Sequence, residues 1–214
     1  MSNLEPHRPE PQALPRQEVK REVIELAKMV VLFLVLFLLL KTFVLEGYEV
    51  QGPSMMPTLQ DRERILVFKF SHKLSQLPLL NGINAIDPGD IVVFDSRDEA
   101  NKRYIKRVIA EGPQRRGGTT VSASDGDASD VVEVDYEHGE VYINNRRMTE
   151  DYLPEEERRS PDRDHRALAG GKYYVLGDHR SVSKDSRSFG PIDDDQIIGR
   201  AVLRFWPPSK FGLL

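Results

Sequence analysis

The run RYIKRVIA, from Arg103 to Ala110, is the stretch that decides the fold of this 214-residue chain. It is rich in aromatic and β-branched residues and lacks glycine and proline, which favours a β-strand over a helix. Four further runs share its β-rich character: RILVFKF at 64–70, DIVVFDS at 90–96, KYYVLGD at 172–178 and IIGRAVLRFW at 197–206. The sequence therefore predicts a mainly β domain.

Turn signals lie between the predicted strands. Residues 87–90 read DPGD, which places Pro and Gly at the centre of a type II turn. The segment VVEVDYEHGEVYINNRR at 131–147 predicts a hairpin that turns at His138–Gly139, with a second turn at Asn144–Asn145. Residues 111–130 are rich in Gly, Ser and Asp and are predicted to form a flexible surface loop. Because no helical period is strong in this part of the chain, we expect an antiparallel, barrel-like fold.

An apolar run near the N-terminus has a different character. Residues 29–40 carry no charge and are almost all large aliphatic residues or Phe. Counted from 23 to 45, with flanking lysines that can snorkel, the stretch reaches the ~20 residues that span a bilayer. A cleavable signal peptide would need small residues after the run, where KTFVLEGYEVQG stands. A buried core helix is the other alternative, but apolar residues on every face favour lipid. We expect one transmembrane anchor at 23–45.

Basic residues indicate how this anchor is oriented. Five basic residues precede the run, more than follow it closely. They are Arg8, Arg16, Lys20, Arg21 and Lys28. The excess predicts a cytoplasmic N-terminal side. Residues 1–22, rich in proline and charge, would then be a disordered cytoplasmic tail. Residues 46–214 would form an extracytoplasmic domain, held by a single pass at the inner (cytoplasmic) membrane.

Charge and cysteine content exclude several function classes. The formal net charge is −4 with no basic block, which argues against nucleic acid as a partner. The chain has no cysteine, which excludes disulfides, a thiol nucleophile and a cysteine metal site.

Ser54, in VQGPSMMPTL at 50–59, follows closely on the apolar run. It is either an ordinary turn residue or a nucleophile, and a nucleophile needs a group that accepts its proton. Of the five histidines only His179, in GDHRSVSKDSRSFG, stands in a suggestive place, so a Ser54–His179–Asp178 triad is one alternative. Against it, Asp178 and His179 are adjacent, and adjacent strand residues point to opposite faces.

Lys106 is the other candidate base. In a strand it shares a face with Tyr104 and Val108, and burial there would lower the pKa of its amine from about 10.4 towards neutrality. The alternative is that the amine snorkels to water while the stem packs. Spacing alone favours the snorkelling alternative, because Ile105 and Ile109 make the opposite face apolar too.

Four blocks resemble the bacterial type I signal peptidases, also called leader peptidases. They are SMMPTL at 54–59, GDIVVF at 89–94, YIKRVI at 104–109 and GDHRSVSKDSRSFGPI at 177–192. With the apolar anchor before them, they cover the chain from the anchor to the C-terminus. The resemblance implies a serine endopeptidase with a Ser–Lys dyad on a mostly β fold, which removes N-terminal signal peptides from exported preproteins after Ala-x-Ala sites. It implies no cofactor and no metal.

The resemblance also implies roles for particular residues. Ser54 would attack the scissile carbonyl, and Lys106 would act as general base and then as acid toward the leaving amine. Ser183 would hydrogen-bond the lysine amine and orient it. The residues implied as structural support of the site are Asp178, Asp185 and Arg187, the last two as an ion pair. Those implied for shallow substrate pockets are Tyr48, Val50, Gly52, Met55, Leu59, Tyr104 and Ile105.

The chain departs from the pattern of these enzymes at several positions. Gly52 stands where some members carry a serine as a second oxyanion donor, and Pro53 where Gly or Ser is more usual. His179 replaces an Asn, Ser181–Val182 replace an Asp-Asn pair, and RVIAEGPQ lacks the common continuation after Lys-Arg.

Two other functions compete with the peptidase. A tethered β domain could bind preproteins or the export translocon without cutting them, but the Ser–Lys pair argues against it. A self-cleaving regulator of the related Ser–Lys class would be soluble and carry a DNA-binding module, which this chain lacks. The expected partners are therefore signal-peptide-bearing preproteins and the lipid bilayer, with the translocon as a further candidate.

Overall fold

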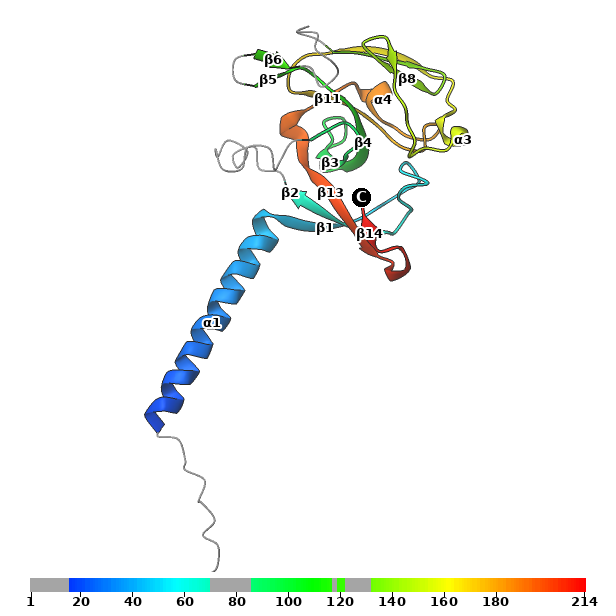
Figure 1. The fold of residues 1–214 in the computed structure, drawn as a ribbon. Helices are drawn as coiled ribbons and strands as arrows, with labels where there is room; N and C mark the ends of the chain where they lie inside the picture. Colours follow the sequence, from blue (N-terminus) through cyan, green and yellow to red (C-terminus); the bar gives the residue numbers. More distant parts are fainter. Residues whose placement is uncertain (1–15, 70–85, 117–118, 122–131) are drawn as a thin grey trace, which may run out of the picture. The chain divides into compact units, whose positions relative to one another are not determined.

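A computed structural model of the chain describes residues 16–69, 86–116, 119–121 and 132–214. The chain divides into two compact units, residues 1–42 and residues 43–214. The ribbon in Figure 1 follows them in sequence colours.

The first unit consists of helix α1, which spans Arg16–Phe43. Residues 16–22 of the expected disordered tail are therefore helical, because RQEVKRE is made mostly of residues that favour helices. The rest of that tail, residues 1–15, lies outside the described residues. Large apolar side chains between Val23 and Leu38 are exposed. Within the part of the chain that the structure describes, no helix is both long and apolar enough to cross a membrane.

The second unit is built on an eight-stranded sheet with the order β1-β2-β13-β3-β4-β11-β12, in which β14 also pairs with β13. Its strands are β1 (Leu45–Glu49), β2 (Arg64–Lys69), β3 (Ile91–Asp95), β4 (Arg103–Glu111), β11 (Lys172–Leu176), β12 (Ile192–Asp193), β13 (Ile197–Trp206) and β14 (Gly212–Leu213). All their pairings are antiparallel. The five predicted runs are thus confirmed as strands, and they form the central path β2-β13-β3-β4-β11.

The expected barrel-like closure is wrong, because this sheet is open. Its path ends at β1 and β12, and these two strands make no ladder with each other among the described residues. Closing a barrel requires the first and last strands to pair. The sequence pattern locates strands along the chain, but it does not indicate whether the two edges of the sheet meet.

A second sheet contains the predicted hairpin. Its order is β10-β7-β8-β9, with β7 at Val132–Glu137, β8 at Glu140–Ile143, β9 at Arg146–Arg147 and β10 at Arg163–Leu168. The two predicted turns are confirmed, since His138, Gly139, Asn144 and Asn145 all have the positive φ that such tight turns require.

The remaining elements are short. The segment 111–130, predicted as a loop, contains the end of β4 and a hairpin of β5 (Gln114–Arg116) and β6 (Thr119–Val121), while residues 122–131 lie outside the described residues. The described residues of the unit also contain four helical turns: α3 (Glu155–Arg158), α4 (Ser186–Phe189), η1 (Asp194–Gln196) and η2 (Pro208–Lys210).

Buried apolar clusters fasten these parts together. One joins the second sheet to the main sheet, because Val134 and Tyr136 of β7 pack with Ile109 of β4 and Leu176 of β11. Another fills the space between the main sheet and the connection from β1 to β2, residues 50–63, which we call the Ser54 loop. Its members are Val50, Met55, Leu59, Ile65, Val67, Ile91, Val93 and Ala201.

Candidate active site

Ser54 lies in a loop that is closed at its base and anchored from beneath. The Val50 N–H donates to Glu63 O, and the Arg62 N–H donates to Val50 O, both at 2.8 Å. Met55 and Leu59 have no exposed surface, and their burial fixes the loop on the sheet. The Ser54 side chain itself remains partly exposed. A short serine side chain is thereby held at the surface by buried neighbours.

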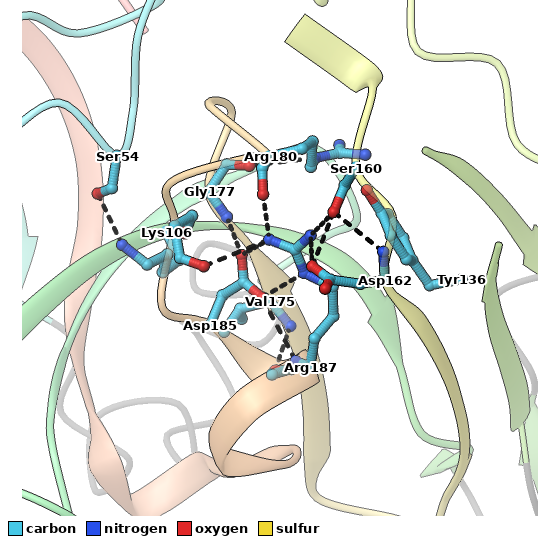
Figure 2. Close-up of polar contacts among 12 residues, drawn as sticks. Ser54, Lys106, Tyr136, Ser160, Asp162, Val175, Gly177, Arg180, Asp185 and Arg187 are labelled. Carbon is cyan, nitrogen blue, oxygen red and sulfur yellow. Dashed lines mark hydrogen bonds and ion pairs between the residues drawn. The ribbon is translucent and has the colours of Figure 1, made fainter. Parts of the chain in front are cut away.

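Lys106 lies on β4, in the interior of the main sheet, where it pairs with Val92 of β3. Its Nζ donates to Ser54 Oγ at 2.8 Å and to Ile105 O at 3.0 Å. Figure 2 shows the two side chains directed toward one another. Lys106 is only 2% exposed, so the snorkelling alternative is wrong.

Burial also changes the acidity of this lysine. Desolvation lowers the pKa of Lys106 to about 8, against the opposing effect of the negative charges of Asp185 and Asp178. A neutral amine can accept a proton, whereas an ammonium ion cannot. About half of the Lys106 side chains would be neutral at pH 8.

The loop at residues 177–185, between β11 and α4, packs directly on Ser54. The His179 N–H donates to Ser54 O at 3.1 Å. A Cβ at Gly177 would lie 2.1 Å from Ser183 Oγ and 2.5 Å from Ser54 O, so only glycine permits this approach. The bond from residue 179 uses a backbone N–H, and therefore any residue except proline can make it.

The expected hydrogen bond between Ser183 and Lys106 is not formed. Ser183 Oγ is buried and has no hydrogen-bond partner among the described residues, and the same holds for His179 Nδ1. The amine of Lys106 instead bonds to Ser54 Oγ and Ile105 O. Ser183 nevertheless lies in the site, because its side chain packs against Gly177 beside the Ser54 carbonyl.

Asp185 and Arg187 form the expected ion pair. Arg187 Nε donates to Asp185 Oδ1 and Nη2 to Asp185 Oδ2, both at 2.8 Å, and Asp185 is fully buried. Asp185 also accepts from the Gly177 N–H at 3.1 Å and caps α4. Arg187 donates onward to Arg180 O, as Figure 2 shows. The pair therefore ties both ends of the 177–185 loop together.

Asp178 has a different partner from the one a triad requires. Its carboxylate accepts from Arg107 Nε at 2.9 Å and from Nη2 at 2.7 Å, and it has no exposed surface. His179 instead points its Nε2 toward Glu157, at 3.5 Å. The Ser54–His179–Asp178 alternative is thus not assembled, and Lys106 is the side chain in contact with Ser54.

The residues implied for substrate pockets divide into two groups. Val50, Met55 and Leu59 are buried in the core, so they can shape a pocket only from underneath. The four that keep exposed surface are Tyr48, Gly52, Tyr104 and Ile105. The Gly52 N–H is already engaged, since it donates to Asp61 Oδ1 at 2.7 Å.

Sequence reasoning missed three buried charged residues around this site. Arg107 is 8% exposed and paired with Asp178. Arg180 and Glu150 are also buried and form an ion pair with each other. An arginine directly after the candidate lysine, on the same strand, is the only signal that could have suggested the first of these.

Comparison with known proteins places the chain in a family. Residues 23–206 match the family described as signal peptidase, peptidase S26. Signal peptidase IB of Staphylococcus aureus (strain COL) is 34% identical over 210 residues, which is 90% of this chain and 94% of that protein. Signal peptidase I of Bacillus licheniformis is 33% identical over 198 residues, covering 88% and 91%. A crystal structure of a signal peptidase I from Enterococcus faecalis V583 aligns with a TM-score of 0.40 at 26% identity, covering 55% of this chain and 97% of that one. The chain belongs to the signal peptidase family, peptidase S26, and is a serine peptidase of that family.

Proposed function

We propose that this protein is a membrane-anchored endopeptidase that removes N-terminal signal peptides from exported preproteins, with Ser54 as nucleophile and Lys106 as general base. The observation that carries the proposal is the 2.8 Å contact between Lys106 Nζ and Ser54 Oγ. The names of the relatives support the reaction class, since they are signal peptidases.

The chemistry follows from the arrangement of these two side chains. Neutral Lys106 accepts the Ser54 proton as Oγ forms a bond to the scissile carbonyl carbon. Lys106 then donates that proton to the leaving amine as the C–N bond breaks, which leaves an ester on Ser54. A water molecule attacks this ester, transfers its proton to Lys106 and releases the new carboxyl end, and Ser54 regains its proton. The lowered pKa of Lys106 lets one amine act in both directions near pH 8.

Ser183, Asp178, Asp185 and Arg187 support this dyad in different ways. The ion pairs of Asp178 with Arg107 and of Asp185 with Arg187 hold the 177–185 loop against Ser54. Ser183 packs beside the Ser54 carbonyl, and its hydroxyl, which has no partner among the described residues, can bond the amine or a substrate group once substrate binds. The Ser54 backbone N–H would serve as one oxyanion donor.

The substrate would be cut after small residues, at sites of the Ala-x-Ala type. Tyr48, Tyr104 and Ile105 offer partly exposed apolar surface around the dyad. The core residues Val50, Met55 and Leu59 pack in one cluster against Tyr48 and Ile105, which leaves little depth for large side chains on that side. Shallow apolar pockets discriminate by size, because a larger side chain meets a packed wall.

The anchor is proposed from the apolar run within α1. Residues 29–40 are uncharged, and the side chains of residues 29–38 are exposed and need an apolar environment. Ser54 follows Leu45 by about nine residues, at most roughly 30 Å of extended chain. An anchor so close to the nucleophile would confine the dyad to the membrane surface, where signal peptides emerge, and would raise their effective concentration.

The test is the cleavage of a peptide with one Ala-x-Ala site by the detergent-purified full chain, read by mass spectrometry. Wild type, Ser54→Ala and Lys106→Ala are compared at equal concentration. A single cut after the second Ala, lost in both variants, is the expected result.

The control is His179→Ala, which removes the alternative base without touching the dyad. A cut that survives Lys106→Ala but not His179→Ala would show that histidine is the base. No cut by the wild type, while a known signal peptidase cuts the same peptide, would favour the binding-only alternative.

A further inference from the structure

Glu150, on the loop that follows β9, places a buried carboxylate beside the candidate site from outside the main sheet. The residue is 2% exposed and none of the motifs in the sequence includes it. Its carboxylate receives two bonds from Arg180, from Nη2 to Oε1 and from Nη1 to Oε2, the latter at 3.1 Å. Its Oε1 also accepts from the hydroxyl of Tyr152 at 2.5 Å. Glu150 is therefore the common acceptor of two side chains.

The first of these side chains leads into the 177–185 loop. Arg180 has no exposed side-chain surface, and its Nε donates to Gly177 O at 3.1 Å. Gly177 is the residue that lies against both Ser54 O and Ser183, and the N–H of His179, two residues further on, donates to Ser54 O. The Arg180 carbonyl in turn accepts from Arg187 at 2.7 Å, drawn in Figure 2. The Glu150 carboxylate thus fixes the Arg180 guanidinium, which in turn holds the 177–185 loop against Ser54.

The second side chain leads to β4. The Tyr152 ring lies 4.1 Å from the guanidinium carbon of Arg107, which stacks over it. Arg107 directly follows Lys106 and holds Asp178, Gly89 O and Thr58 Oγ1. The two branches from Glu150 therefore end on either side of the dyad, one on the loop against Ser54 and one on the strand of Lys106.

We propose that Glu150 is a positioning residue for the Ser54–Lys106 dyad, acting through Arg180 on the 177–185 loop and through Tyr152 on Arg107 of β4. This role rests on the proposed function and extends it to the segment after the second sheet, which contributes no residue to the dyad itself. Burial is what makes the carboxylate effective, because an uncompensated Arg180 would move toward water and carry the loop with it.

The test compares Glu150→Gln, Glu150→Ala and Tyr152→Phe in the full detergent-purified chain with the Ala-x-Ala peptide. Glu150→Gln keeps the shape but loses the charge, and Tyr152→Phe keeps the ring but loses the hydroxyl. We expect kcat to fall about 10- to 100-fold in the two Glu150 variants, with KM little changed, because small displacements of reacting groups are costly. Tyr152→Phe should lose less, since its ring still supports Arg107.

The pH profile separates positioning from stability alone. If the loop loosens, water reaches Lys106 and its pKa rises, so the acid limb of kcat/KM should move to higher pH in the Glu150 variants. The matched control is Glu140→Gln, which breaks an exposed ion pair with Arg147 within the second sheet. It should change neither kcat nor the position of the acid limb. Thermal unfolding is followed for every variant.

The double variant Glu150→Met with Arg180→Met guards against misfolding of the single variants. It replaces a buried ion pair with apolar volume, which proteins often tolerate. We expect the double variant to fold. It should show the same loss of kcat as the Glu150 single variants and the same shift of the acid limb of kcat/KM to higher pH. A folded Glu150→Gln or double variant with wild-type kcat and pH profile would overturn the inference, as would a fall in unfolding temperature alone. If the wild type cuts nothing, or if Ser54→Ala still cuts, the proposed function fails and the inference with it.

Discussion

The Nζ of Lys106 lies 2.8 Å from the Oγ of Ser54, although 52 positions of sequence separate the two residues. The lysine is carried by an interior strand of the main sheet and the serine by a loop whose apolar side chains are buried on that sheet. Lys106 is therefore held by the neighbouring strands of β4, and Ser54 by the buried residues of its own loop. A short donor–acceptor distance between two such groups is what general-base activation of a hydroxyl requires.

The buried amine of Lys106 predicts a characteristic pH dependence of stability. Its folded pKa of about 8 lies below the ordinary value of 10.5, so between these pH values the unfolded chain binds more protons. The contribution of Lys106 to the free energy of unfolding should therefore rise from pH 8 to 10.5. Below pH 8, burying this lysine should lower the free energy of unfolding by about 3 kcal/mol. Lys106→Met should unfold at higher urea concentration than wild type at pH 7, and the difference should shrink by pH 10. Lys184→Met, at an exposed lysine, is the control that should show no such gain.

The same pKa predicts the acid limb of the activity profile. Only the neutral amine accepts the Ser54 proton, so kcat/KM should fall as pH drops, with an apparent pKa of about 8. The measurement is peptide cleavage from pH 5 to 10 with wild type and His179→Asn. An acid limb that disappears in His179→Asn would contradict the assignment of Lys106 as base.

Gly177→Ala should abolish most activity through a steric effect. The added methyl would overlap Ser183 Oγ and Ser54 O, so the 177–185 loop or the Ser54 loop must move. We expect kcat to fall about 100-fold or more. Gly47→Ala is the matched control, because its methyl meets only Phe205 at 3.7 Å, and it should retain activity within about twofold. Equal activity of the two variants would show that the close approach at Gly177 is unnecessary.

Arg107→Met should destabilise the domain strongly. It leaves the fully buried Asp178 carboxylate without its cation, a change that typically costs about 3–5 kcal/mol. Arg147→Met removes a cation from the exposed pair with Glu140 and should cost less than about 1 kcal/mol. Denaturant unfolding of both variants measures the contrast, and similar losses would mean that Asp178 is less isolated from water than its burial indicates.

The proposed anchor predicts a sensitivity to charge in the middle of the apolar run. Leu34→Arg together with Leu36→Arg should release the protein from carbonate-washed membranes, because each arginine costs about 2.5–3.5 kcal/mol at the centre of a membrane helix. Glu22→Arg, which changes charge before the run, should leave the protein in the membrane fraction. Retention of the double variant would argue that the run does not span the bilayer.

Local patterns in the sequence were enough to predict five strands of the main sheet and the two turns of the second sheet, but not the short strands or the β5–β6 hairpin. RYIKRVIA and the four other β-rich runs formed neighbouring strands, and His138–Gly139 and Asn144–Asn145 formed the expected turns. The motif resemblance also selected Ser54 and Lys106 from a chain with many serines and lysines. These features depend on residues close together in sequence, or on residue types at set positions in a motif, and both can be read without coordinates.

Tertiary structure alone decided how these parts meet. Spacing alone favoured a snorkelling Lys106, because both faces of β4 are apolar, and the structure buries it instead. Its burial depends on strands that pair from distant segments. Spacing also could not show that Arg107 neutralises Asp178, that Ser183 Oγ lies without a partner among the described residues, or that Glu150 holds Arg180. The pKa of Lys106 is set by desolvation, and desolvation is a property of the packed chain rather than of any residue in it.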